Sequence, residues 1–236
     1  MFYYGFDLTY LIMVMPFVIL SIWASSNVNS TFKRYSKVYS RRGLTGAQAA
    51  EQVLKNNGVY NVRIERVSGN LTDHFDPKAN VIRLSDNVYG NTSAAAIGVA
   101  CHEAGHAVQY AQDYAPIKLR AAIIPVTNIG SMLAMPLIVL GLVLNFMTEF
   151  SYTFVYIGIG CFGLSLLFQL ITLPVEFNAS HRAVAAISGA GLLDKQELDG
   201  AKKTLRAAAL TYVAAAAVSL IQLLRLILIF GGRRDD

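Results

Sequence analysis

The chain of 236 residues is 54% hydrophobic and only 15% charged, and its mean hydropathy is +0.44. A soluble domain carries about 25% charged residues, so this composition excludes an ordinary soluble protein and indicates a membrane protein. The formal net charge of +5 comes from basic residues beside apolar runs, which favours a lipid bilayer over nucleic acid as the partner. Two cysteines, Cys101 and Cys161, are too few for a disulfide framework and are expected to be buried thiols.

The first apolar run predicts a membrane anchor over residues 1–26. Leu8 to Ala24 is uncharged and just long enough to span a bilayer. Nothing basic precedes this run, which argues against a cleaved signal peptide. Basic residues follow it instead, namely Lys33, Arg34, Lys37, Arg41 and Arg42. This asymmetry predicts that the N-terminus is outside the cell and that the chain after the anchor is cytoplasmic.

Residues 27–120 are predicted to form a cytoplasmic domain, because Gly43 to about Leu119 has ordinary soluble composition. Within it, Thr45 to Gln48 fits a capping box at the start of a helix that ends near Asn56.

Two short strands are predicted next. Val59 to Val67 alternates like a half-exposed strand, and Val81 to Ser85 reads as a second one, so we expect a small antiparallel hairpin. The intervening Ser68 to Asn80 is rich in turn residues, and its lone histidine, His74, is expected to be exposed to solvent. Asn87 to Asn91 is a second turn cluster.

The sequence Cys101 to His106 (CHEAGH) has the H-E-x-x-H pattern of a zinc-binding helix. Residues four apart lie on one face of a helix, so His102 and His106 can bind one ion. Glu103 lies on the adjoining face, where its carboxylate can take a proton from water at that ion. The alternative is a buried helix whose two histidines hydrogen-bond to each other.

The context of this motif supplies the helix that it needs. Ala94 to about Asp113 consists of strong helix formers, with Thr92 or Ser93 as the N-cap. The small residues Ala104 and Gly105 would let a substrate or another backbone approach closely, and ordinary helix packing would also explain them.

Residues 121–175 are predicted to be a transmembrane helical hairpin that starts and ends in the cytoplasm. Ala121 to Met147 and Phe150 to Val175 are uncharged and long enough to span, and Thr148-Glu149 would form a short external turn.

Residues 176–206 are predicted to be a further cytoplasmic helical segment, and residues 207–236 a fourth span with an external tail. Proline suits the first turn of a helix, so we expect a new or kinked helical segment to begin at Pro174. Arg225 near the end of the last span can snorkel to the interface.

Catalytic zinc usually has three protein ligands and one open position. Glu176 is the first acidic residue after the hairpin and the strongest candidate to join His102 and His106. The alternative role for Glu176 is a carboxylate at a helix N-terminus, where the helix dipole favours it. His181 would project about 140° away from Glu176 on a helix, which makes it a poor co-ligand.

This ligand set predicts one zinc ion per chain and a peptide-hydrolysing mechanism. Glu103 would accept a proton from the attacking water and deliver it to the leaving amine. His181, Arg182, His74 and nearby tyrosines are the candidates to stabilise the oxyanion. The strand at residues 81–85, just before the motif helix, could pair with an extended substrate.

Three blocks of the sequence resemble a known family: TDHFDPKANVIRLS, NVYGNTSAAAIGVACHEAGHAVQYA and PVEFNASHRA. They are similar to the neutral zinc metallopeptidases of the YugP-like bacterial membrane family, and the similarity covers nearly the whole chain. The resemblance implies a membrane-bound zinc metalloprotease with an architecture similar to the HtpX-like proteases, whose third ligand is the glutamate of an E-x-x-x-D pattern. Carried over, Glu176 is the third ligand. Ser180 stands where that wider group has aspartate, which leaves Asn178 or another residue to orient a ligand imidazole.

The predicted fold is therefore a predominantly α membrane protein, with about four transmembrane helices and a small α+β zincin-like domain carrying H-E-x-x-H on a helix. The predicted function is a zinc metalloendopeptidase that acts on peptide or membrane-protein substrates at the cytoplasmic membrane surface. One alternative is an inactive membrane scaffold, whose structural zinc would be closed by four protein ligands. A metal sensor or transporter is disfavoured because the spans hold essentially no acidic or histidine residues. The sequence leaves the oligomeric state open.

Overall fold

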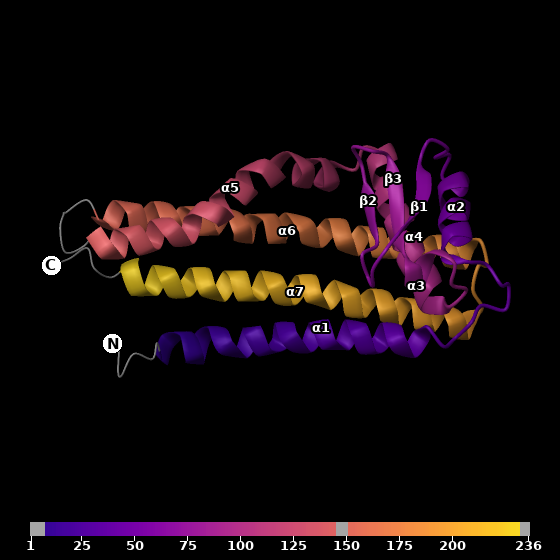
Figure 1. Ribbon diagram of the computed structural model, residues 1–236, viewed down its shortest axis with the longest axis horizontal. Helices are drawn as coiled ribbons and strands as arrows, with labels where there is room; N and C mark the ends of the chain where they lie inside the picture. Colours follow the sequence, from indigo (N-terminus) through magenta and orange to yellow (C-terminus); the bar gives the residue numbers. More distant parts are fainter. Residues whose placement is uncertain (1–7, 145–150, 232–236) are drawn as a thin grey trace. The chain divides into compact units, whose positions relative to one another are not determined.

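The computed structural model describes residues 8–144 and 151–231, which are mostly helical (Figure 1). The elements before the motif helix are the π-helical turn η1 (Tyr10–Val14), α1 (Met15–Tyr35), α2 (Gly46–Asn56), β1 (Arg63–Val67), β2 (His74–Asp76), β3 (Val81–Ser85) and α3 (Asp86–Tyr89). They are followed by α4 (Ala94–Ala111), α5 (Ala115–Leu144), α6 (Ser151–Gly189) and α7 (Lys195–Gly231).

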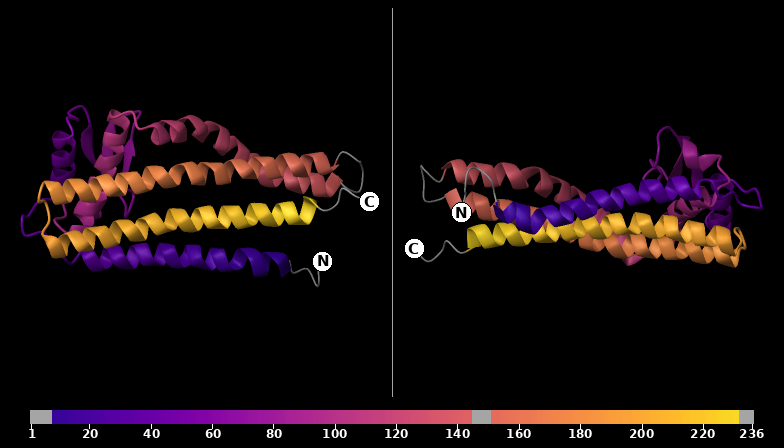
Figure 2. Two further views of the ribbon diagram at one scale, coloured as in Figure 1. Left: turned by 180° about the vertical axis from the view of Figure 1, so that it is seen from behind. Right: turned by 90° about the horizontal axis from the view of Figure 1, so that it is seen from below.

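Within the described residues, four helical stretches are long and apolar enough to cross a membrane, which confirms the predicted number of spans. They are Tyr10–Tyr35, Ala115–Leu144, Tyr152–Gly189 and Lys195–Gly231. The last two form the unbroken helices α6 and α7 in Figure 2. The predicted turn at Thr148 and Glu149 and the tail after Gly231 lie outside the described residues.

Of the two alternatives expected at Pro174, a new or a kinked helical segment, the new helix is wrong, because α6 continues through this residue from Ser151 to Gly189. A proline removes one backbone hydrogen bond, yet long apolar helices tolerate it. Glu176 therefore lies inside a helix, and a helix N-terminus does not account for its position.

Contacts along the chain divide it into two compact units. Unit 1 consists of Met1–Trp23, Leu119–Leu173 and Tyr212–Asp236, and unit 2 consists of Ala24–Lys118 and Pro174–Thr211. In unit 1, α5 and α6 pack closely at Gly158, where an added Cβ atom would lie 2.8 Å from the Ala134 carbonyl oxygen. Unit 2 contains the sheet, α2 to α4 and the predicted metal ligands.

The sheet of unit 2 has the strand order β1-β3-β2. β3 pairs with β1 in parallel and with β2 antiparallel, so the expected antiparallel hairpin of residues 59–67 and 81–85 is wrong. The true hairpin partner, β2, lies inside the turn-rich segment between those two strands. Because β3 is the central strand, it offers no free edge to a substrate, which corrects the expected pairing at residues 81–85.

Local sequence signals set the helix starts of unit 2. Thr45 and Gln48 form the predicted reciprocal capping box at α2, and Ser93 caps α4 by accepting a hydrogen bond from the Ala96 amide. The predicted turn cluster at residues 87–91 instead contributes to the one-turn helix α3. Nearly every residue of α4 is buried, so this helix forms the centre of unit 2.

Candidate metal centre

Helix α4 presents two imidazoles on one face. His102 and His106 are four residues apart, and their ring centroids lie 4.7 Å from each other in an edge-on arrangement. Both side chains are largely buried, with 13% and 10% of their surface exposed. The α4 face that carries them therefore points into unit 2 with a small opening to solvent.

Glu176 of α6 brings a carboxylate to the same point. Its Oε2 atom lies 3.2 Å from Nε2 of His102 and 3.4 Å from Nε2 of His106, and its side chain is 2% exposed. One ligand atom from each of the three residues lies within 4.8 Å of the other two. The structure thus brings together the three residues that the sequence predicted as metal ligands.

A glycine allows α6 to approach α4 this closely. A Cβ atom added to Gly105 would lie 2.8 Å from the carbonyl oxygen of Ala179, a separation at which one of the backbones would have to move. Gly105 lies between Glu103 and His106 on α4, and Ala179 is three residues after Glu176 on α6. The small residue of the motif therefore serves helix packing, one of the two roles expected for it.

The two distances from Oε2 of Glu176 to the imidazole nitrogens fit a tetrahedral zinc ion. Ligand atoms about 2.0–2.2 Å from such an ion are about 3.3–3.6 Å from one another. The Nε2–Oε2 distances of 3.2 and 3.4 Å are close to this separation. Two imidazoles and one carboxylate are also a ligand set of catalytic zinc sites, which leave a fourth position for water or substrate.

The electrostatics of the site favour a cation. Burial by itself would lower the pKa of His106, but the hydrogen bond to Glu176 and the negative charges of Glu103 and Glu176 raise this pKa above its ordinary value overall. The carboxylates thus stabilise positive charge at the imidazole, and a metal ion bound to these atoms would be stabilised in the same way.

Glu103 lies close enough to His106 of the candidate site for their charges to interact, and it is 8% exposed. Among the described residues, its carboxylate forms no hydrogen bond or ion pair, so it is available to a bound water or substrate. Asp73 is close enough for its charge to interact with that of Glu103. Asp73 accepts hydrogen bonds from the amide and the hydroxyl of Ser85, at 2.7 and 3.0 Å.

Each histidine of the cluster has a hydrogen-bond partner at its second ring nitrogen. The hydroxyl of Ser180 lies 3.1 Å from Nδ1 of His102, and Oε1 of Gln109 lies 3.0 Å from Nδ1 of His106. Gln109 was not predicted from the sequence, because a single glutamine in a helix belongs to no recognisable metal-binding motif. Ser180 occupies the position at which the resemblance leads one to expect an aspartate, and its hydroxyl makes the contact to the imidazole.

The structure places the other candidate residues in different roles. His74 is exposed and its Nδ1 lies 2.8 Å from the Thr72 carbonyl oxygen, and His181 is exposed on α6. Arg182 donates from Nε to Asn178 and from Nη1 to Gln112. Cys101 is fully buried, which raises the pKa of its thiol, whereas Cys161 is partly exposed, contrary to the prediction of two buried thiols.

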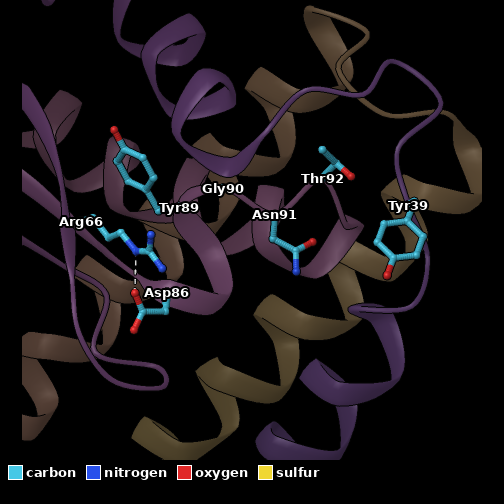
Figure 3. Close-up of a pocket in the computed structure, with 7 residues that line it drawn as sticks. All are labelled: Tyr39, Arg66, Asp86, Tyr89, Gly90, Asn91 and Thr92. Atoms are coloured by element: carbon cyan, nitrogen blue, oxygen red, sulfur yellow. Dashed lines mark hydrogen bonds and ion pairs between the residues drawn. The ribbon is translucent and has the colours of Figure 1, made fainter.

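Unit 2 also has a surface pocket of about 440 Å³, and neither the three candidate ligands nor Glu103 line it (Figure 3). It is lined by Tyr39, Arg66, Asp86, Tyr89, Gly90, Asn91 and Thr92. Its one carboxylate, Asp86, is paired with Arg66, as the dashed line in Figure 3 marks. This pocket therefore offers no set of metal ligands, and the cluster on α4 and α6 remains the candidate site.

Comparison with known proteins gives a family match over almost the entire chain. Residues 10–231 match the family described as "Putative neutral zinc metallopeptidase". The chain is 48% identical over 217 residues to the "Putative membrane protease YugP" of Bacillus subtilis (strain 168), covering 92% of this chain and 94% of that protein. No solved structure matches the chain.

Proposed function

The chain belongs to the family of neutral zinc metallopeptidases, and from this premise we propose that it is a membrane-bound zinc metalloendopeptidase of the H-E-x-x-H type. The observation that carries the proposal is the meeting of His102, His106 and Glu176, with Glu103 beside them. The ligand geometry supports one zinc ion per chain. We expect the substrates to be peptides or membrane proteins.

The imidazoles of His102 and His106 and the carboxylate of Glu176 would hold the ion. When bound, zinc polarises a substrate carbonyl and lowers the pKa of water to about 7. Glu103 would accept a proton from the attacking water and then deliver it to the nitrogen of the leaving amine. The burial of Glu103 excludes bulk water from this carboxylate, which strengthens its interactions with the reacting groups.

The test is zinc content and peptide cleavage by the purified full-length protein in detergent. We expect about one zinc per chain and cleavage of quenched fluorescent peptides. Glu103→Gln should keep the zinc and lower the cleavage rate by about 10²–10⁴-fold. Glu51→Gln is the matched control, because Glu51 is exposed on α2 and pairs with Lys55. Cleavage by Glu103→Gln at the wild-type rate would contradict the mechanism, and a wild-type protein without zinc would contradict the function.

We also propose that unit 2 faces the cytoplasm. The basic residues at the end of α1 and just after it support this orientation, since positive charge is retained on the cytoplasmic side. The exposed Tyr60, replaced by cysteine, gives a test with a membrane-impermeant maleimide. We expect labelling of Tyr60→Cys only after the cells are opened, with the wild-type chain as the control. Labelling of intact cells would reverse the orientation.

A further inference from the structure

Gln109 is a fully buried polar residue on α4, three residues after His106. Its carboxamide makes three contacts. The Oε1 atom lies 3.0 Å from Nδ1 of His106, and Nε2 donates to the Val175 carbonyl oxygen at 2.8 Å and to Oδ1 of Asn178 at 2.9 Å. Val175 and Asn178 belong to α6, so this one side chain joins the two helices that carry the candidate ligands.

The partners of Gln109 allow only one orientation of its amide. The Val175 carbonyl can only accept a hydrogen bond, so the NH₂ group of Gln109 must face it. Asn178 presents its oxygen to Gln109, because the same Oδ1 atom accepts a hydrogen bond from Nε of Arg182 at 2.7 Å, and a guanidinium only donates. The carbonyl end of the Gln109 amide is therefore the end that faces His106.

This orientation determines where the hydrogen lies on the neutral His106 ring. Because Oε1 of Gln109 accepts, Nδ1 of His106 must donate. In the neutral imidazole the other nitrogen, Nε2, then carries a lone pair. That lone pair belongs to the atom that lies 3.4 Å from Oε2 of Glu176. At this separation the two acceptor atoms are stabilised by a positive charge between them, either a proton on Nε2 or a metal ion.

We propose that Gln109 is the positioning residue of the metal centre, holding His106 as the Nδ1–H tautomer and fixing the turn of α6 that carries Glu176. This inference rests on the proposed function, because it concerns the same zinc ligands. One buried amide orients two ligands from two helices, His106 through its oxygen and Glu176 through the carbonyl of the preceding residue.

The charge of the site explains why a neutral partner suits this position. Metal-binding histidines often donate their second ring N–H to a carboxylate. Here three carboxylates, those of Asp73, Glu103 and Glu176, already lie in or beside the cluster. A fourth buried negative charge would have to be desolvated next to them, whereas an amide oxygen accepts the same hydrogen bond without that cost.

Two variants separate the contacts of Gln109. Gln109→Met keeps the length of the side chain and removes every hydrogen bond. Gln109→Glu keeps an acceptor for Nδ1 of His106 and removes the donor to the Val175 carbonyl and to Oδ1 of Asn178. The matched control is Gln52→Met, because Gln52 is an exposed glutamine of α2 that donates to Asn56.

The first measurement is the ¹⁵N spectrum of the histidine side chains in metal-free full-length protein at alkaline pH, with His106 identified by its loss in His106→Gln. We expect the Nδ1–H tautomer of His106 in the wild type, in Gln109→Glu and in Gln52→Met. Gln109→Met should instead show a mixture of the two tautomers. An Nε2–H tautomer in the wild type, or an unchanged tautomer in Gln109→Met, would overturn the proposal.

The second measurement is zinc affinity by competition with a chelator. We expect Gln109→Met to bind zinc about 10–100-fold more weakly than the wild type and Gln52→Met to bind it equally well. If Gln109→Met does not fold, Gln109→Glu carries the test, and it should lose affinity while it keeps the tautomer. Wild-type zinc affinity in every Gln109 variant that folds would overturn the role of Gln109. A wild-type protein that binds no zinc would overturn the proposed function, while the tautomer measurement would still test Gln109.

Discussion

The Oε2 atom of Glu176 lies 3.2 Å from Nε2 of His102, although 74 residues separate the two along the chain. Most of the intervening chain forms α5 and the first part of α6, which are two of the four candidate spans. Ordering so long a segment costs entropy, so the contact depends on the packing of α4 against α6 at Gly105. A metal ion held by both helices would add to that packing.

Glu176→Gln should remove most of the zinc affinity. The substitution preserves the volume of the side chain but deletes the negative charge that two imidazoles contact. Loss of a residue that only hydrogen-bonds to a metal ligand weakens metal binding by about 10–100-fold. We expect Glu176→Gln to lower the zinc affinity, measured by chelator competition, by more than this. Glu197→Gln is the matched control. Glu197 is also buried, but its carboxylate accepts hydrogen bonds from the backbone amides of Arg41 and Asp194 and contacts neither imidazole. Equal zinc affinity in Glu176→Gln and the wild type would exclude Glu176 as a ligand.

Ser180→Ala should weaken zinc binding by about tenfold, because the Ser180 hydroxyl is the partner of Nδ1 of His102. Loss of that contact frees the ring to rotate and to change its tautomer. Ser188→Ala on the same helix is the control, since Ser188 is exposed. A zinc affinity that is the same in Ser180→Ala and Ser188→Ala would show that the hydroxyl does not orient His102.

The sequence predicts the membrane spans and the helix caps of this protein better than its strand pairing. Hydropathy is enough for the four spans, because a bilayer demands about 20 apolar residues regardless of the tertiary context. Capping signals are equally local, and Thr45 and Ser93 cap their helices as predicted. β2 was not predicted, because a strand of three residues within a turn-rich segment is too short to show the alternation of apolar and polar residues that indicates a strand.

The same contrast holds at the candidate site. The motif spacing and the order of the chain lead to His102, His106 and Glu176, and the structure brings these residues together. The role of Gln109 depends on which atoms of α6 face it, and only the tertiary structure provides that. Ser180 stands where the resemblance leads one to expect an aspartate, and the structure shows that its hydroxyl still contacts the His102 imidazole. Here the contact was not predicted, because the residue type differs from the expected one.

Gly105→Ala should lower stability and weaken zinc binding together. The added Cβ atom would meet the Ala179 carbonyl oxygen at 2.8 Å, so α4 and α6 must separate. Overpacking of this kind costs about 1–3 kcal/mol and would lengthen the distance from Glu176 to the imidazoles. Gly189→Ala on α6 is the control, because nothing lies within 4 Å of its added Cβ atom. Thermal unfolding with and without zinc measures both effects, and an unchanged zinc-dependent shift in Tm would contradict the link to the site.

Asp73→Asn should alter the pH dependence of stability, and its sign follows from the burial of the carboxyl. Burial raises the pKa of Asp73 above its ordinary value of 3.8, and the charge of Glu103 adds to this increase against the opposing hydrogen bonds from Ser85. The stabilising effect of a protonated Asp73 is therefore complete below 3.8 and is lost as the pH rises through the higher pKa of the folded state. Asparagine keeps an oxygen for the Ser85 amide and carries no charge.

We therefore expect the Tm of metal-free Asp73→Asn, relative to the wild type, to increase as the pH is raised from about 4 to 7. Asp76→Asn provides a control of opposite sign. The hydrogen bond from Arg83 lowers the pKa of Asp76, so the stabilising effect of this carboxylate is present above 3.8 and is lost as the pH falls. Between pH 4 and 7 the Tm of Asp76→Asn relative to the wild type should therefore stay nearly constant, and it should rise only as the pH falls below 3.8. If the relative Tm changes with pH in the same way for the two variants, the charged form of Asp73 is not destabilised by its burial beside Glu103.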